Sequence, residues 1–493
     1  MKDESEKDMN KATLQKPRMT HLALTVLTAL LALMAGCASQ PAGMNAPKAG
    51  GATVPSNWQY AMATAAPADG VALDEAWWKR FNTPELDALI DRVLASNTNL
   101  ATAAIRVRQA QLRADLANSA RLPSVSAGAK VGASRSLDHD TGTLRSSSAS
   151  VSASWELDLW GRLAAQRDAA AWEASATEAD RRGVALSLVG TTARLYWQLA
   201  YLDERVTSAE NSLAYARKTL SLVQALHQGG ATSGLEDAQA EQAVRAQEGA
   251  LSQLTQTRME IRQSLALLLD GPTQSAQLPE HPAWPMGAWP TVAPDLPAQV
   301  LARRPDVLAA EARLHGAFAA VDATRASYYP PISLTGSVNG GGTSLGAILS
   351  NPVGSLGAAL VLPFLQWRDM QRNLSISQGD AEAAVLGFRQ TLYSALADVD
   401  KTLSARDQLN IQALAQNERL AQAQKVERLT ELRYRSGAEP LRSWLEAQEA
   451  RRQAELAAAD VRFNQLSNWV SLVQALGGGA SAAAGTQRTA ATP

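Results

Sequence analysis

The chain has 493 residues, of which only 5% are aromatic, and its 46 Lys and Arg residues nearly balance its 47 Asp and Glu residues. A net charge of −1 offers no electrostatic capture of nucleic acid, so the composition excludes a nucleic-acid partner. The five histidines never lie three or four residues apart. Their spacing therefore contains no metal-ligand pair and no catalytic dyad, and we expect neither an enzyme nor a cofactor.

The amino terminus is typical of a secretory signal. Basic residues up to Arg18 precede an apolar run from His21 to Met34, which is too short for a transmembrane helix of about 20 residues. Cys37, the single cysteine, follows Ala35 and Gly36 at the expected cleavage point, and these residues resemble a bacterial lipobox. We predict a lipoprotein signal peptide over 1–36 and acylation of Cys37, where each buried methylene contributes about 0.8 kcal/mol to anchoring. Residues 37–83 are expected to form a lipidated tether and an extended segment.

In two segments of the chain, apolar and polar residues alternate with a period of two, which is typical of β-strands. A helical tract from Pro84 to about Ala120 ends at Pro123. Apolar and polar residues then alternate over 125–133 and 150–159, which predicts a β-hairpin over 123–160. A second hairpin is predicted over 330–366, with strands at 332–339 and 356–364. Each strand approaches the length of about 9 to 11 residues that crosses a membrane at a tilt.

A soluble sandwich would show the same alternation as membrane strands. However, both hairpins stand between long helices, and no further strands remain to form a second sheet. Four strands cannot close a barrel, and lipid does not tolerate an open sheet edge. We therefore predict membrane strands that several protomers share. The aromatic residues near the helix-facing ends are then candidates for the membrane interface, although aromatic residues at such ends also serve plain packing: Trp155, Trp160, Tyr328 and Tyr329.

Between the hairpins, apolar and small residues recur at alternating spacings of four and three. The first such seam covers five heptads between Leu188 and Val223, and no proline falls between Gly161 and Gly230. This predicts one helix roughly 100 Å long, with a turn at Gly230 and a return helix. A second long helix is predicted over 368–435, before a turn at Gly437, with a less regular seam that includes Leu429.

The two halves of the chain repeat. The same interval of 207 residues separates Gly230 from Gly437 and Trp160 from Trp367. We predict a tandem duplication with one repeat over 84–270 and another over 300–476. Residues 271–299 form a linker rich in Pro and Trp, and residues 477–493 form a disordered tail.

Taken together, these features resemble the outer membrane factor family of TolC-like and OprM-like channels, and most closely the lipoprotein, NodT-type branch found in RND efflux systems. The residues that carry the resemblance are Cys37, Trp155 to Arg162, Gly230 to Ala240, Arg303-Arg304-Pro305-Asp306, Tyr329-Pro330-Pro331 and Tyr434 to Gln448. The resemblance implies a mainly α fold with a transmembrane β part. Long coiled-coil hairpins of a homotrimer would form a periplasmic α-barrel, and four strands per protomer would form a shared 12-stranded β-barrel.

The resemblance also implies a function. The protein would be anchored in outer-membrane lipid and extend into the periplasm. It would passively conduct drugs, toxic compounds or ions from an inner-membrane pump of the RND type, through a periplasmic adaptor, to the exterior. The sequence identifies neither the cargo nor the adaptor.

A tunnel of this kind needs a gate, and the helix-tip turns at Gly230 and Gly437 are its expected place. By resemblance, Glu236, Tyr434 and Glu446 occupy positions of the family's closing network, whereas Ser443 replaces a companion acid. Three neighbouring arginines, Arg433, Arg435 and Arg442, are candidates to pair with the acids Glu236, Asp237 or Glu446. The alternative is that all of these are solvated helix-end charges, worth at most about 1 kcal/mol each.

Two other classes of protein remain as alternatives. A structural or adhesive coiled-coil lipoprotein of the cell envelope would use the strands as a small soluble cap. A periplasmic enzyme is the third, and the absence of a convergent His, Cys or metal-spaced cluster weighs against it.

Overall fold

The computed structural model describes residues 53–60, 76–135, 143–285, 289, 297–350 and 352–478. The predicted signal peptide, Cys37 and the chain beyond residue 478 lie outside these residues. No described helix combines the length and the low polarity needed to span a bilayer.

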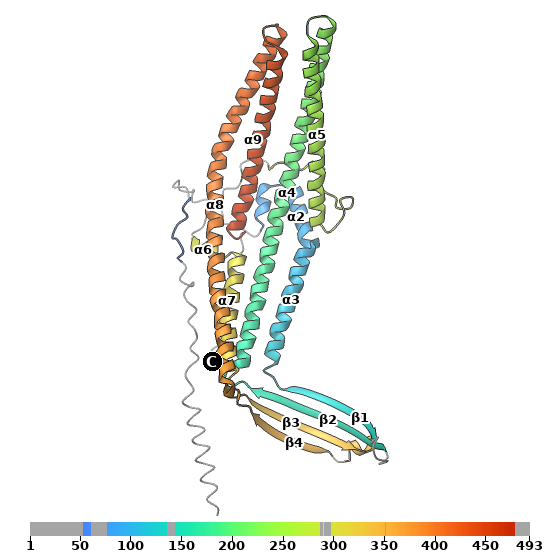
Figure 1. The fold of residues 1–493 in the computed structure, drawn as a ribbon, viewed down its shortest axis with the longest axis vertical. Coiled ribbons are helices and arrows are strands. Elements are labelled where there is room, and N and C mark those ends of the chain that lie inside the picture. Colours follow the sequence, from blue (N-terminus) through green and yellow to red (C-terminus); the bar gives the residue numbers. More distant parts are fainter. Residues whose placement is uncertain are drawn as a thin grey trace, which may run out of the picture. The chain divides into compact units, whose positions relative to one another are not determined.

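Two helical hairpins dominate the described chain. Helices α4 (Arg162–Gln228) and α8 (Trp367–Arg435) have 67 and 69 residues, so each is about 100 Å long. Each turns back into a helix of 35 residues, α5 (Gly234–Leu268) or α9 (Leu441–Ala475), as Figure 1 shows in green and in orange to red. The prediction of one unbroken helix between Gly161 and Gly230 is confirmed.

The other half of each long helix packs against shorter helices. Helix α4 contacts α3 (Thr98–Ser119) and α7 (Pro305–Ala326), each of 22 residues, and α8 also contacts α7. Helices α2 (Pro84–Ser96) and α6 (Pro297–Leu301) precede α3 and α7 along the chain. The helices thus recur in the same order, and α3 with α7 and α5 with α9 have equal lengths, in agreement with the 207-residue interval.

The apolar seam of α4 lies in the interior, with Leu188, Leu199 and Val223 all buried. In α8 the seam is buried as far as Leu403, but the expectation for Leu429 is wrong, because this side chain is 53% exposed. Glu427 occupies the buried position instead, with 8% exposed. A carboxylate is stable there because an arginine of α9 pairs with it.

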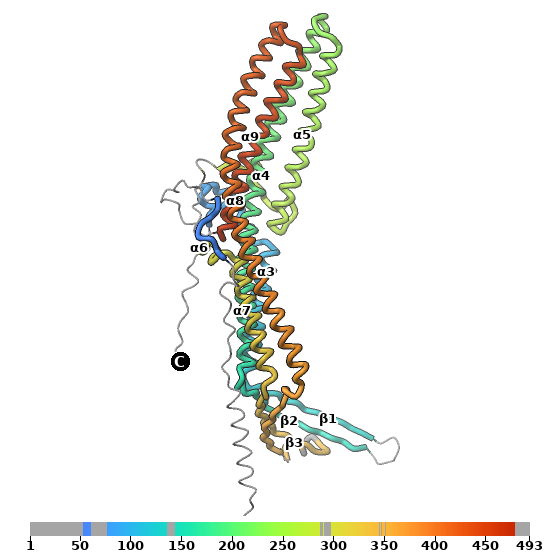
Figure 2. Tube along the Cα trace, turned by 60° about the vertical axis from the view of Figure 1, so that its left-hand side comes forward, coloured from blue at the N-terminus to red at the C-terminus, as the bar shows by residue number. Residues whose placement is uncertain are grey.

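The four strands form one antiparallel sheet in chain order: β1 (Ser124–Arg135), β2 (Thr143–Leu157), β3 (Ile332–Gly342) and β4 (Val353–Leu360). Strands β2 and β3 pair from Ser147↔Gly342 to Leu157↔Ile332, which joins the two repeats into one sheet. Figure 2 shows the strands leaving the helices together. Strands β1 and β4 each pair on one side only within this sheet.

Two expected elements differ from the structure. The fourth strand does not reach residue 364, because Pro363 lacks an N–H for the ladder and begins the short 3-10 helix η4 (Pro363–Gln366). The tract from Pro84 to Ala120 is broken at Asn97. The Oδ1 atom of Asn97 accepts hydrogen bonds from the backbone N–H groups of Asn99 (3.0 Å) and Leu100 (3.1 Å), which caps a new helix.

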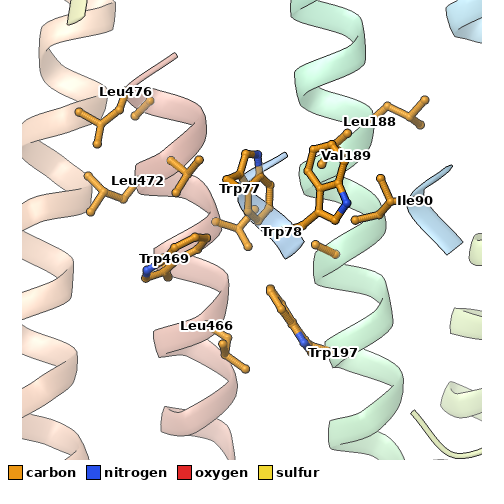
Figure 3. Close-up of a cluster of buried hydrophobic side chains, with 14 of the residues drawn as sticks. Trp77, Trp78, Ile90, Leu188, Val189, Trp197, Leu466, Trp469, Leu472 and Leu476 are labelled. Carbon is orange, nitrogen blue, oxygen red and sulfur yellow. The ribbon is translucent and has the colours of Figure 1, made fainter. Parts of the chain in front are cut away.

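The main core contains aromatic residues from a segment that we expected to be extended. The 3-10 helix η2 (Trp77–Phe81) lies between α4 and α9, and Figure 3 shows Trp77 and Trp78 in the space between the helices that carry Trp197 and Trp469. The ring centroid of Phe81 lies 4.8 Å from that of Trp197 and 4.7 Å from that of Trp469. Because aromatic residues are rare in this chain, the three within Trp77–Phe81 were the available signal of a packed segment.

Candidate functional site

Both hairpin tips turn through a glycine with positive φ. Gly230 has φ +74° and Gly437 has φ +73°. In the first tip, Ala231 N–H donates to Leu226 O and Gly230 N–H donates to His227 O, and the second tip repeats both bonds 207 residues later. A residue with a Cβ costs about 1–2 kcal/mol in this conformation, which explains why both turns contain glycine at this position.

An aromatic cluster joins the two hairpins below the tips. Tyr434 of α8 is buried and stacks on Trp444 of α9, with 5.1 Å between ring centroids. Trp444 meets Tyr215 of α4 edge to face at 6.2 Å, and Val223 and Ala240 complete the buried surface. The tips are therefore held together mainly by apolar contact. Sequence reasoning missed Trp444 and Tyr215, although Leu441, Trp444 and Ala447 follow helical spacing.

One of the expected ion pairs is present at this site, whereas Arg433 and Arg435 pair with acids that we did not expect. Arg442 forms an ion pair with Glu446 at 2.7 Å within α9. The expected pairing of Arg435 with an acid of α5 or α9 is not observed, because Arg435 bonds Glu431 one turn earlier in α8 at 2.7 Å. An i, i+4 partner on the same helix is closer than a partner on another hairpin. Arg433 similarly pairs with Glu439, within its own tip.

The acids at the start of α5 remain unpaired within the described chain. Glu236 and Asp237 lie in the first helical turn, where the helix dipole favours negative charge. Neither forms an ion pair with a described residue. The Oδ1 atom of Asp237 and the Oη atom of Tyr434 are buried and have no described hydrogen-bond partner. Burial, together with the charge of Glu236, raises the pKa of Tyr434, so its hydroxyl remains a donor at neutral pH.

A polar layer lies below the aromatic cluster. Arg451 of α9 bonds Glu427 at 2.7 Å and Glu455 at 2.8 Å, and Tyr215 donates to Glu431 at 3.3 Å. A crevice of about 620 Å³ between α4, α8 and α9 is bordered by Tyr215, Glu427, Arg451 and Glu455. Burial raises the pKa of Glu427, and the charge of Glu431 adds to this effect, whereas Arg451 opposes it. The hairpins thus meet here through hydrogen bonds and charges.

We expect Glu427→Gln to change the pH dependence of unfolding. The folded chain binds the Glu427 proton more tightly than the unfolded chain, because its folded pKa lies above the usual 4.5. The carboxyl therefore loses stabilising free energy as the pH rises through the window between these two pKa values. The neutral amide removes this loss, so the unfolding midpoint of the variant should rise relative to that of the wild type as the pH increases above 4.5.

The control is Glu418→Gln, which alters an exposed position of the same helix. Thermal unfolding at several pH values should show no such gain for this variant. An equal trend in both variants would contradict a special role of the buried carboxyl.

The predicted interface aromatics gather where the helices meet the sheet. Trp160 stacks on Tyr329, with 5.1 Å between ring centroids, and donates its Nε1–H to Pro330 O at 2.9 Å. Trp155 donates to Arg121 O at 3.0 Å, and the hydroxyl of Tyr328 accepts from Asn373 at 2.7 Å. Their contacts are thus with the chain itself, and their place at a membrane interface stays a prediction. Among the described residues, no group of His, Cys, Asp and Glu is arranged to hold a metal ion.

Comparison with known proteins places both repeats in one family. The family model described as outer membrane efflux protein matches residues 89–271 and 296–478. The pyoverdine export outer membrane protein OpmQ of Pseudomonas putida is 36% identical over 470 residues, which cover 93% of this chain and 97% of OpmQ.

Two further proteins extend the comparison. The probable outer membrane lipoprotein SilC of Salmonella typhimurium is 26% identical and covers 91% of this chain and 96% of SilC. The solved open state of the MtrE outer membrane channel of Neisseria gonorrhoeae is 27% identical with a TM-score of 0.76, covering 87% of this chain and 96% of MtrE. The chain therefore belongs to the outer membrane efflux protein family.

Proposed function

We propose that this protein is a gated exit duct of the outer membrane and that contacts between its helix tips hold the duct closed. As a member of the efflux family, it is an outer-membrane channel and not an enzyme. It passively conducts solutes that an inner-membrane pump delivers through a periplasmic adaptor. The family match also disfavours the alternative of a structural or adhesive coiled-coil lipoprotein.

The observation that carries this function is the four-stranded sheet with two open edges, attached to helices about 100 Å long. A membrane-spanning sheet has to close, and three copies supply twelve strands. The hairpins of the homotrimer then form the periplasmic α-barrel. Acylation of Cys37 completes the proposal, because lipid chains on this residue would hold the mature amino terminus in the outer membrane.

Support for a gate comes from the groups that lack partners in one protomer. Glu236 has no described ion-pair partner, and buried polar atoms of Asp237 and Tyr434 have no described hydrogen-bond partner. A buried unpaired polar group costs about 1–3 kcal/mol. Threefold symmetry would bring equivalent tips to a common axis, where groups of neighbouring protomers can satisfy one another. The related MtrE channel has been solved in an open state.

Single-channel conductance in a planar bilayer tests the gate. Detergent-extracted, lipidated protein should behave as a trimer by mass and show low conductance. We expect Glu236→Ala and Arg442→Ala each to raise the conductance severalfold, because each removes a charge that would hold neighbouring tips together. The increase should be smaller at about 1 M salt, where screening already weakens the pairs in the wild type.

The matched control is Arg419→Ala. This variant removes one positive charge from an exposed position of α8, 16 residues before Arg435 and therefore about 24 Å from it along the helix. Its conductance should equal that of the wild type. An unchanged closed state in both tip variants would reject the gate and leave these groups as solvated helix-end charges.

A further inference from the structure

The register of the sheet isolates one charge in the middle of its polar face. We propose that Lys130, contributed by each of three protomers, forms a positive ring inside the shared β-barrel and gives this part of the duct a preference for anionic solutes. The inference rests on the proposed function, because it requires that solutes pass through the barrel.

The pairing of the strands defines the two faces of the sheet. Directly paired residues of antiparallel strands project to the same side, so Lys130 shares a face with Ser148 and Gly341. Further along this face, Ser126 and Ser152 share a hydrogen bond of 2.8 Å between their hydroxyl oxygens. The same face continues across the other two strands mainly through hydroxyl and amide side chains, namely Thr335, Ser337, Asn339 and Ser355, with Val353 as an apolar member at the start of β4.

The opposite face is apolar and exposed in the protomer. Among its exposed large apolar side chains, the exposed fractions run from 38% for Trp155 to 94% for Leu356, and the others are Val125, Val131, Val151, Leu334, Val338 and Leu360. In a transmembrane barrel the apolar face contacts lipid and the polar face lines the lumen. This assignment places Lys130 inside the barrel.

Two charged residues lie on the polar face among the described strand residues, and Lys130 is the one without an ion-pair partner there. The other charge on this face, Glu156, receives two hydrogen bonds of 2.8 Å from the same nitrogen of Arg162 at the helical end of the sheet, which neutralises it. Arg135 and Arg145 lie on the opposite, apolar face, near the distal end of β1 and β2. No described carboxylate forms an ion pair with Lys130.

The neighbours of Lys130 leave its side chain free to project. Two residues away on the same face are Gly128 and Gly132, and its direct partner is a serine. Lys130 is exposed in the protomer, so nothing in the sheet covers its ammonium group. Lys130 has an alternative role, because a lysine on an edge strand such as β1 also discourages aggregation. In that role the charge would protect the strand edge and would not act on solutes in the lumen.

The size of the barrel decides whether this charge reaches a passing solute. Twelve tilted strands about 4.8 Å apart enclose a backbone radius of about 12–15 Å. A lysine extends about 6 Å from the backbone, which leaves its charge about 6–9 Å from the axis. The Debye length is about 10 Å at 0.1 M salt and about 3 Å at 1 M. Three Lys130 side chains should therefore act across the lumen at low salt and lose most of this effect at high salt.

The test measures the electrostatic potential beside Lys130 without requiring an open gate. Ser150 is diagonal to Lys130 on the same face, and Ser150→Cys provides a thiol there in the full-length trimer. Its rates of reaction are measured with two methanethiosulfonates, one bearing a sulfonate and one bearing a trimethylammonium group. The parent protein, whose single cysteine is Cys37, serves as the blank. Both reagents can enter from the external side.

We expect the ratio of the anionic to the cationic rate to fall severalfold when Lys130→Gln is added at about 0.1 M salt, and to change little at about 1 M. Arg145→Gln, on the opposite face, should leave the ratio unchanged. An equal ratio with and without Lys130 at low salt would overturn the proposal. Reaction at Ala149→Cys but not at Ser150→Cys would also overturn it, because the polar face would then not line the lumen. A failed gate would instead appear as unchanged conductance of the tip variants.

Discussion

Replacing Arg304 with alanine should lower the free energy of unfolding by about 2–4 kcal/mol. The Arg304 side chain is 9% exposed and ties three helices together. Its guanidinium donates to Ala395 O of α8 at 3.2 Å, to Ala475 O at the end of α9 at 3.0 Å, and to Asp306 at the start of α7 at 2.7 Å. The variant removes the Arg304 hydrogen bonds from two carbonyl groups and leaves a cavity between the helices.

The carboxylates around Arg304 determine how the effect depends on pH. Burial acts to raise the pKa of Asp306, but the hydrogen bonds and charge of Arg304 hold this pKa below its usual value of 3.8. The stabilisation from Asp306 is therefore present at neutral pH and lost as the pH falls through its folded pKa. The variant should accordingly lose less stability on acidification than the wild type.

Chemical and thermal unfolding of the detergent-extracted trimer would measure the loss at Arg304. Arg182→Ala is the matched control, because Arg182 is 46% exposed and forms an i, i+4 pair with Glu178. That variant should cost at most about 1 kcal/mol. Arg304→Lys should fall between the two, since an ammonium cannot bond all the acceptors that the planar guanidinium reaches. Equal losses for Arg182→Ala and Arg304→Ala would contradict the assigned role.

Replacing Trp444 with alanine should loosen the helix tips at a cost of about 3–5 kcal/mol of local packing. Trp444 is 2% exposed and contacts both Tyr434 and Tyr215, so it links α9 to α8 and α4. We expect faster hydrogen exchange of the backbone amides near Gly230 and Gly437, and longer open times in a planar bilayer. The open times would increase because the hairpins separate more readily.

The control for Trp444 is Trp172→Ala. Trp172 lies on α4 in the half that packs against α7, is 36% exposed, and stacks on His315 with 4.7 Å between ring centroids. Its loss should leave exchange at the tips and channel gating unaltered. If both variants opened the channel equally, general destabilisation rather than the tip cluster would explain the result.

Local features of the sequence were sufficient for the architecture. The seam from Leu188 to Val223 and the absence of proline predicted α4, because heptad spacing and helix formers act over neighbouring residues. The alternation around Val151 predicted β2 for the same reason, since the period of a strand is a local property. Gly230 and Gly437 marked the tips because the positive φ of such a turn favours glycine.

The tertiary structure decided which distant side chains meet. The burial of Glu427 in place of Leu429 depends on Arg451 from another helix, and no periodicity within α8 reports that partner. Trp77 and Phe81 belong to the core because α4 and α9 leave a space that aromatic rings fill. Heptads and strand alternation are set within a few residues of chain, whereas these contacts depend on how separate helices pack.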